Sequence, residues 1–340
     1  RGIPFAQVTF GTDNGCAAYM LGHEGEGLFY AARIQDRLAF HCGLFSGALA
    51  QRAFWKSWDY SMMRRQGRTT NSEKDQPVEI IAHPAVKRLL LSARTASDGI
   101  LALCLASANF ADRAHEEGAE NKRYAKIAWI LGAVSASPSV IRAKRAVESA
   151  AAATGSFACL EEAGFDVLRR DMEGLAVHPR TTEVAAADFL VRGIFPDSGD
   201  ALLCLFGEIR NTADICLENP GLIGMSSSLI SAVDRAAEVT GFILELHNQN
   251  QDAIALQDAT LYADIIWLTA SAWLWLRQAA VAGDALEQRP NGRYARFYEG
   301  RVASARYFFE YELPALEALS KTIMSGQGVP FLFFHEQYRL

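Results

Sequence analysis

Residues 21–68 read LGHEGEGLFYAARIQDRLAFHCGLFSGALAQRAFWKSWDYSMMRRQGR. It opens with a turn rich in Gly and Glu and continues as one long helical pattern. Small residues lie along one side and allow a second helix to approach closely. They are Gly43, Ser46, Gly47, Ala48 and Ala50. The basic end, residues 64–68, suits an anion such as a diphosphate, although a solvated helix end explains the same pattern.

The composition indicates a globular protein. Half of the 340 residues are hydrophobic, the net charge is −6, and the length predicts one to three domains. Scattered charges argue against a nucleic-acid partner. The longest apolar run, residues 265–276, is too short for a membrane span, so we expect a buried helix. The six cysteines lack metal-binding spacing, so we expect no metal site, reduced thiols and a cytoplasmic location.

Apolar residues recur at helical spacing through most of the chain, which predicts a mostly α protein built as an antiparallel bundle. The expected helices cover residues 28–63, 85–117, 121–154, 184–192, 201–217, 226–247, 251–281 and 295–324. Pro138 should kink or interrupt its helix. Residues 154–180 contain three glycines and Pro179, and we expect a connecting loop there. Residues 1–19 are expected to form one or two short strands.

The opening stretch resembles the acyl-CoA dehydrogenase family at the passage from its β-domain to its C-terminal helical domain. The matching positions are residues 21–28, Arg37, Leu38 and residues 64–68. Residues 81–90 and 294–319 resemble the branch with a C-terminal extension, the methylmercaptopropionyl-CoA dehydrogenase-like enzymes. The resemblance covers nearly the whole chain. It implies a β-domain remnant in residues 1–22, the helical bundle in residues 23–195 and an appended helical extension in residues 196–340.

The family's chemistry needs a carboxylate that removes the α-proton of an acyl-CoA thioester. At the position of the usual base this chain has Pro179, followed by Arg180, so the usual carboxylate is missing. A minority of the family carries its base on the first bundle helix, and the corresponding residue here is Asp36. An ordinary surface ion pair with Arg33 is the competing interpretation of Asp36. His41 is expected to be a core histidine, and His178 is a weak acid–base candidate.

The resemblance also implies FAD as the cofactor. Arg64 matches the arginine that reaches the FAD diphosphate, and Gln66 and Gly67 match the residues that follow it. Gly155 is the glycine kept from a site contributed by the neighbouring subunit. Thr181 and Thr182 match contacts near the flavin, and Glu183 is expected to cap the next helix.

Three hypotheses remain from the sequence. The chain is part of an FAD-dependent acyl-CoA dehydrogenase-like oxidoreductase of fatty acid metabolism, an inactive relative used for assembly, or a flavoprotein with altered chemistry. The family's first helical domain and most of its β-domain are absent, so this chain alone cannot complete the family's active site. The expected partners are an acyl-CoA thioester and either a homo-oligomer, dimer or tetramer, or a second chain that supplies the missing domains.

Overall fold

The computed structural model describes residues 6–11, 15–68, 76–116, 118 and 121–328, and only the backbone of Asp36. From residue 27 onward these ranges are mostly helical, and the β pairing of the described residues is limited to one isolated bridge between Arg65 and Glu79. The prediction of a mostly α bundle is confirmed. The predicted strands of the β-domain remnant are absent from the described ranges 6–11 and 15–22, and the other residues of that segment lie outside the described chain.

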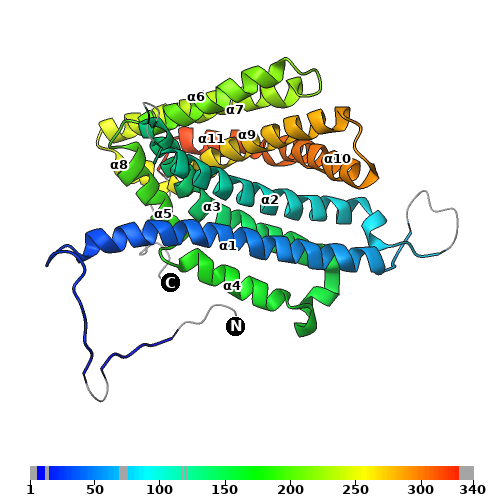
Figure 1. Cartoon of the computed structure of the whole chain (residues 1–340), viewed down its shortest axis with the longest axis horizontal. Coiled ribbons are helices and arrows are strands. Elements are labelled where there is room, and N and C mark those ends of the chain that lie inside the picture. The colour runs from blue at the N-terminus through cyan, green and yellow to red at the C-terminus, as the bar shows by residue number, and fades with distance from the viewer. Residues whose placement is uncertain (1–5, 12–14, 69–75, 117, 119–120, 329–340) are drawn as a thin grey trace.

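Five helices form the first part of the bundle (Figure 1). They are α1 (Gly27–Met63), α2 (Pro84–Arg113), α3 (Asn121–Thr154), α4 (Phe165–Val177) and α5 (Thr182–Phe189). Short 3₁₀ helices occupy Ile80–Ala82, Gly155–Cys159 and Glu161–Ala163, and a π-helix, Leu190–Ile194, follows α5. Helices α1, α2 and α3 pack along one another and frame the candidate site described below.

The second part contains six helices arranged around α9 (Figure 1). They are α6 (Asp200–Leu217), α7 (Ile223–Asn248), α8 (Asp252–Gln257), α9 (Ala259–Glu287), α10 (Gly292–Tyr307) and α11 (Ala315–Met324), with a π-helix, Phe308–Glu312, before α11. Because α9 also packs on α2, α3 and α5, one continuous core joins both parts. The predicted boundary at residue 196, between the helical bundle and the helical extension, remains a prediction.

Close approach of α1 and α3 depends on the small residues of α1. Gly43, Ser46, Gly47 and Ala50 are buried, whereas Ala48 faces outward. A Cβ atom at Gly43 would lie 1.8 Å from the carbonyl oxygen of Ser135 on α3. The predicted small face therefore brings the two helix backbones together, with Ala48 excluded from it.

One sequence-based expectation about this part of the chain is wrong, and another is wrong in part. Residues 154–180 are not a connecting loop, because α4 forms there and buries Phe165, Leu168, Met172 and Leu175 at helical spacing. The predicted break at Pro138 does not occur, because α3 runs unbroken past this residue, while the predicted kink stays a prediction. Proline at this position frees the carbonyl of Val134, and the Ser139 hydroxyl donates a hydrogen bond of 3.3 Å to that oxygen.

Within the part of the chain that the structure describes, three helical segments are long and apolar enough to cross a membrane, judged by length and composition alone. They are Pro84–Arg113, Asn121–Cys159 and Ala259–Glu287. In the fold these helices pack inside the bundle, and 83% of the apolar window of α9 is buried. The expected burial of residues 265–276 is confirmed, while the absence of membrane spans stays a prediction.

Candidate functional site

A cavity of about 420 Å³ lies between α1, α2, α3 and α5, within the size range of small-molecule pockets. Phe40, Trp129 and Phe189 form the large apolar part of its wall, together with several alanines. Charged groups and one histidine join this wall from α1, α2, α5 and the loop and π-helix on either side of α5. They are Arg37, His41, Asp112, Arg180, Asp188 and Arg192. An apolar wall with a few charged groups suits an amphipathic ligand with an anionic part.

The loop between α4 and α5 is fixed against this cavity by two hydrogen bonds. The Cys42 thiol of α1 donates to the carbonyl of His178 over 3.1 Å. The Ser137 hydroxyl of α3 donates to the carbonyl of Thr182 over 2.8 Å. Burial raises the pKa of the Cys42 thiol, which keeps it in the protonated form that donates. The loop that carries Pro179 is thus held at α1 and α3.

The two positions where the family carries a base both lie beside this cavity. Pro179 precedes the wall residue Arg180, and Asp36 precedes the wall residue Arg37. Asp36 lies near the start of α1 and Pro179 lies just before α5. The two positions are far apart in the sequence, and the fold brings them close together. The Asp36 side chain lies outside the described residues, so its role as a base stays a prediction.

His41 is exposed at the cavity, so its expected place in the core is wrong. Its Nδ1 atom lies 2.7 Å from the carbonyl oxygen of Arg37. Because a carbonyl only accepts, Nδ1 carries the hydrogen, and Nε2 is the nitrogen that can take up a proton.

Two aspartates in the cavity wall were missed by the sequence analysis. Asp188 is paired with Arg180 and lies 3.8 Å from Arg192. Asp112 is exposed near the end of α2, and within the described residues no hydrogen bond or ion pair engages its carboxylate. Asp112 is therefore a second candidate proton acceptor. No sequence motif marks it, since only the packing of α2 on α3 brings it to this wall.

The predicted diphosphate contacts lie at the other end of α1. The rings of Tyr60 and Phe157 stack with centroids 4.9 Å apart and bring the end of α1 to the 3₁₀ helix that begins at Gly155. Arg64, Gln66 and Gly67 follow directly on the chain and are exposed. This group of four predicted residues therefore shares one end of the bundle.

Arg64 is suited to bind an anion at this end. Its backbone is fixed, since its amide donates to Tyr60 over 2.9 Å and its carbonyl accepts from Ile80 over 2.8 Å. Within the described chain no hydrogen bond or ion pair engages its guanidinium. Gly155 has φ +69° and open space where a Cβ would stand, so its backbone is accessible to a ligand. By contrast, the backbone amide of Gln66 already donates a hydrogen bond to the carbonyl of Val78.

Thr181 and Thr182 lie apart from that group, beside the loop at Cys42. About 33 Å of helix separates Cys42 from Arg64, so one chain presents the predicted cofactor contacts as two separate groups. Thr181 caps α5, because its Oγ1 accepts from the Val184 amide at 3.4 Å, and the predicted capping role of Glu183 is wrong. The Thr182 hydroxyl donates to Glu183 over 3.0 Å. A bond from its own backbone amide is the main cause that lowers the pKa of Glu183.

Comparison with known proteins extends the resemblance to specific relatives. Residues 205–330 match the family model described as acetyl-CoA dehydrogenase C-terminal like. The chain is 26% identical over 90% of its length to the broad-specificity linear acyl-CoA dehydrogenase FadE5 of Mycobacterium tuberculosis, covering 52% of that protein. It is 27% identical over 92% of its length to the 3-methylmercaptopropionyl-CoA dehydrogenase of Ruegeria pomeroyi, again covering 52%. The chain thus spans about half the length of these relatives.

Solved structures share the fold at lower identity. Caenorhabditis elegans ACDH-11 in complex with C11-CoA matches with a TM-score of 0.70 and 16% identity, over 93% of this chain and 50% of that one. A Bacillus anthracis acyl-CoA dehydrogenase complexed with FAD matches with a TM-score of 0.68 and 15% identity, over 92% and 55%. The family model and the curated relatives show that the chain is similar to acyl-CoA dehydrogenases, and the solved structures show that it shares their helical fold.

Proposed function

We propose that this chain is the helical part of an FAD-dependent, acyl-CoA dehydrogenase-like oxidoreductase that acts on an acyl-CoA thioester. The observation that carries the proposal is the cavity between α1, α2, α3 and α5, at which both family base positions meet. Its apolar wall would hold the acyl chain, and Arg37 in this wall would attract the anionic part of the ligand. The bound flavin would supply the acceptor for the β-hydride.

The FAD contacts that this chain offers fit the cofactor in two groups. Arg64 and the exposed backbone of Gly155 suit a diphosphate. Thr181 and Thr182 lie near the cavity, where they would face the flavin. Because the two groups are about 33 Å apart along α1, we infer that two copies, or this chain and another, complete each FAD site.

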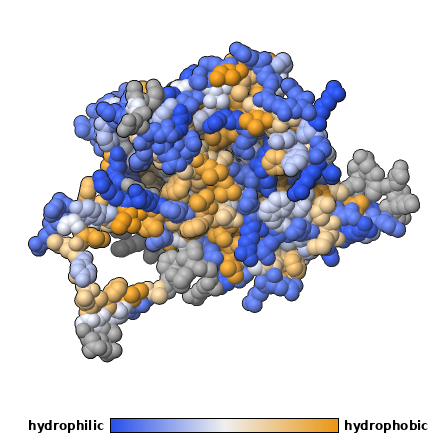
Figure 2. All heavy atoms as spheres, viewed as in Figure 1, coloured by the Kyte–Doolittle hydropathy of each residue, from blue (hydrophilic) through white to orange (hydrophobic). Residues whose placement is uncertain are grey.

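Exposed apolar residues support a partner on this side of the molecule. Figure 2 shows a hydrophobic surface that follows the first half of α1. Its largest members are exposed to solvent in the isolated chain: Leu28, Phe29, Ile34, Leu38 and Phe45. Isolated soluble proteins rarely leave a contiguous surface of this kind uncovered. Its location beside the candidate site suits a second copy or the domains that the family carries before this bundle.

An absorbance scan tests the cofactor, because a bound flavin gives a yellow protein with a flavin spectrum. The scan is made on this chain alone and on the full-length protein. A colourless full-length protein would contradict the proposal and favour the alternative, an inactive relative that serves assembly. The feature that favours this alternative is Pro179, which cannot take a proton at the usual base position. The free thiols of all six cysteines fit a reducing compartment, and we propose a cytoplasmic location.

The base is tested by three separate substitutions in the full-length protein: Asp36→Asn, Asp112→Asn and His41→Gln. Each keeps size and removes the proton acceptor. A positioned base contributes roughly 10²–10⁴-fold to the rate, so we expect Asp36→Asn to remove turnover while flavin absorbance is kept. Turnover like that of the wild type would exclude Asp36, and loss in one of the other two variants would move the role to that residue.

A further inference from the structure

A second cavity, of about 500 Å³, lies in the seam where α1 and α2 meet α10. It belongs to neither family base position nor the predicted diphosphate contacts. Among the described residues that line it, none is acidic and four are cationic: Lys87, Arg94, Arg296 and Arg301. The remaining wall is mostly apolar. A cavity with cations and no carboxylate is selective for an anion.

Large aromatic rings stay accessible in this cavity. The exposed fractions are 47% for Trp55, 37% for Trp58 and 53% for Phe297. The ring of Phe54 lies behind Trp55, with centroids 5.0 Å apart. Aromatic side chains provide much of the contact energy of binding surfaces. Their exposure here indicates an occupant with an apolar body.

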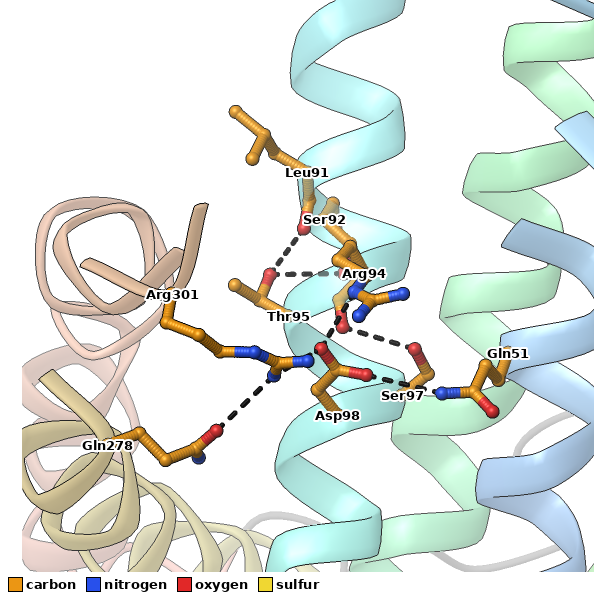
Figure 3. A network of polar contacts seen from close by, with 9 residues as sticks. All are labelled: Gln51, Leu91, Ser92, Arg94, Thr95, Ser97, Asp98, Gln278 and Arg301. Carbon is orange, nitrogen blue, oxygen red and sulfur yellow. Dashed lines mark hydrogen bonds and ion pairs between the residues drawn. The ribbon is translucent and has the colours of Figure 1, made fainter. Parts of the chain in front are cut away.

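The cluster behind the cavity wall has more positive than negative charge. Figure 3 shows Asp98 of α2 between two arginines, Arg94 of the same helix and Arg301 of α10. One oxygen of Asp98, Oδ2, lies 2.7 Å from Arg94 Nε and 2.6 Å from Arg301 Nη1. Its other oxygen accepts from Gln51 of α1 at 3.4 Å. One carboxylate thus serves two guanidinium groups.

The environment of Arg94 shows that the excess of positive charge is not balanced within the described chain. Its Nη1 is buried and has no hydrogen-bond partner among the described residues. Burial is the main cause that lowers the pKa of Arg94, and the charge of Arg301 acts in the same direction. The Arg94 guanidinium also lies over the rings of Phe54 and Trp55, at 5.1 and 5.2 Å. Lys87 and Arg296 are exposed at the same cavity and add two further charges. An anion in the cavity would offset this charge.

We propose that the seam cavity binds an amphipathic carboxylate, with the charged head held by the cations and an aliphatic body on the tryptophan and phenylalanine rings. A carboxylate matches the planar fork of arginine. The volume is sufficient for a medium-length aliphatic chain, within the 300–1,000 Å³ of small-molecule pockets. Because the cavity joins the bundle to α10, an occupant would also link the two parts of the chain.

The test is calorimetric titration of this chain with decanoate as the probe. Acetate lacks the apolar body, and decanol lacks the charge, so we expect neither to bind at concentrations where decanoate saturates. Replacing both Lys87→Gln and Arg296→Gln should weaken decanoate binding about 10- to 100-fold, the range expected for charged hydrogen bonds. Arg293→Gln, an exposed arginine of α10 outside the cavity, is the matched control and should leave binding unchanged.

A second variant tests the location without removing a charge. Gly300 lines the cavity on α10, and a Cβ there meets nothing within 4 Å. Gly300→Leu should therefore fold, fill the cavity and abolish decanoate binding. Unchanged binding in Gly300→Leu would overturn the proposal, as would equal affinity for decanol. Binding of adenosine monophosphate in place of decanoate would also overturn it and assign the cavity to a nucleotide.

Discussion

Arg142 of α3 and Asp264 of α9 form a bidentate ion pair between these two helices. Arg142 Nε lies 3.0 Å from Oδ1 of Asp264, and Nη2 lies 2.7 Å from Oδ2. Glu312 adds a contact of 3.3 Å to Nη1, and the guanidinium lies 5.0 Å from the ring centroid of Trp267. The Arg142 side chain is only 7% exposed. This group ties α3 to α9 through specific contacts, beyond the shared apolar core.

Removing both members of this pair should cost less than the sum of the costs of removing each one alone. We expect Asp264→Leu to lower the free energy of unfolding by about 3 kcal/mol, because it leaves Arg142 buried with only Glu312 beside it. The double variant Arg142→Met, Asp264→Leu should lose less than the sum of the single variants. Urea denaturation of the wild type and the three variants measures this. Additive losses would contradict it.

The contact between Gly43 and Ser135 predicts a second stability effect. Any side chain at Gly43 meets the backbone of α3, which cannot move aside as a side chain can. We expect Gly43→Ala to destabilise the protein by about 3 kcal/mol or more, in the upper range for overpacking. Gly27→Ala is the control, because open space surrounds it at the start of α1. Thermal unfolding of both variants checks the difference, and a Tm of Gly43→Ala equal to that of the wild type would refute it.

These two helix contacts show what a sequence can predict. The small residues of α1 predicted that another helix packs closely against it. Close packing depends on side-chain size alone, and side-chain size is known from the sequence. The identity of that partner, Ser135 of α3, depends on packing over a long sequence separation. Likewise the apolar spacing of α4 was present at Phe165, Leu168 and Met172, but neighbouring glycines suggested a loop. Asp112 and Trp129 could not be assigned to the cavity, since no local pattern distinguishes them from surface residues on other helices.

Alkaline pH should destabilise the fold, because the buried thiol of Cys104 and the buried phenol of Tyr262 resist ionisation in the folded state. Burial raises the pKa of Cys104 from 9.0 to about 11, and burial also raises the pKa of Tyr262 well above its usual value. The unfolded thiol ionises first, so the stability that Cys104 contributes is complete below pH 9 and is lost between about pH 9 and 11. Two pKa units correspond to about 3 kcal/mol. Urea denaturation from pH 7 to 11 should show this fall, and Cys104→Ala should make it shallower. An identical slope in the variant would exclude Cys104 as its source.

The last prediction concerns Trp129, which lines the cavity between α1, α2, α3 and α5. Trp129 stacks on Phe189, with ring centroids 5.8 Å apart and an angle of 18° between the rings. It also lies against Gly193, where a Cβ would be 1.8 Å from the indole ring. The position of the Trp129 indole is therefore set by the ring of Phe189 and by close contact with Gly193, which leaves room for it because it has no side chain.

Two opposite substitutions follow from this geometry and rest on the proposed acyl-CoA function. Trp129→Ala enlarges the cavity, so the full-length protein should shift its preference toward longer acyl chains. Gly193→Ala forces the indole to move, and we expect a shift toward shorter chains or weaker binding of all chains. Titration with a series of acyl-CoAs of increasing chain length measures both. Each CH₂ buried is worth about 0.8 kcal/mol, so affinity should rise about fourfold per carbon until the wall is reached. A chain-length profile that neither substitution alters would show that the acyl chain does not end at Trp129.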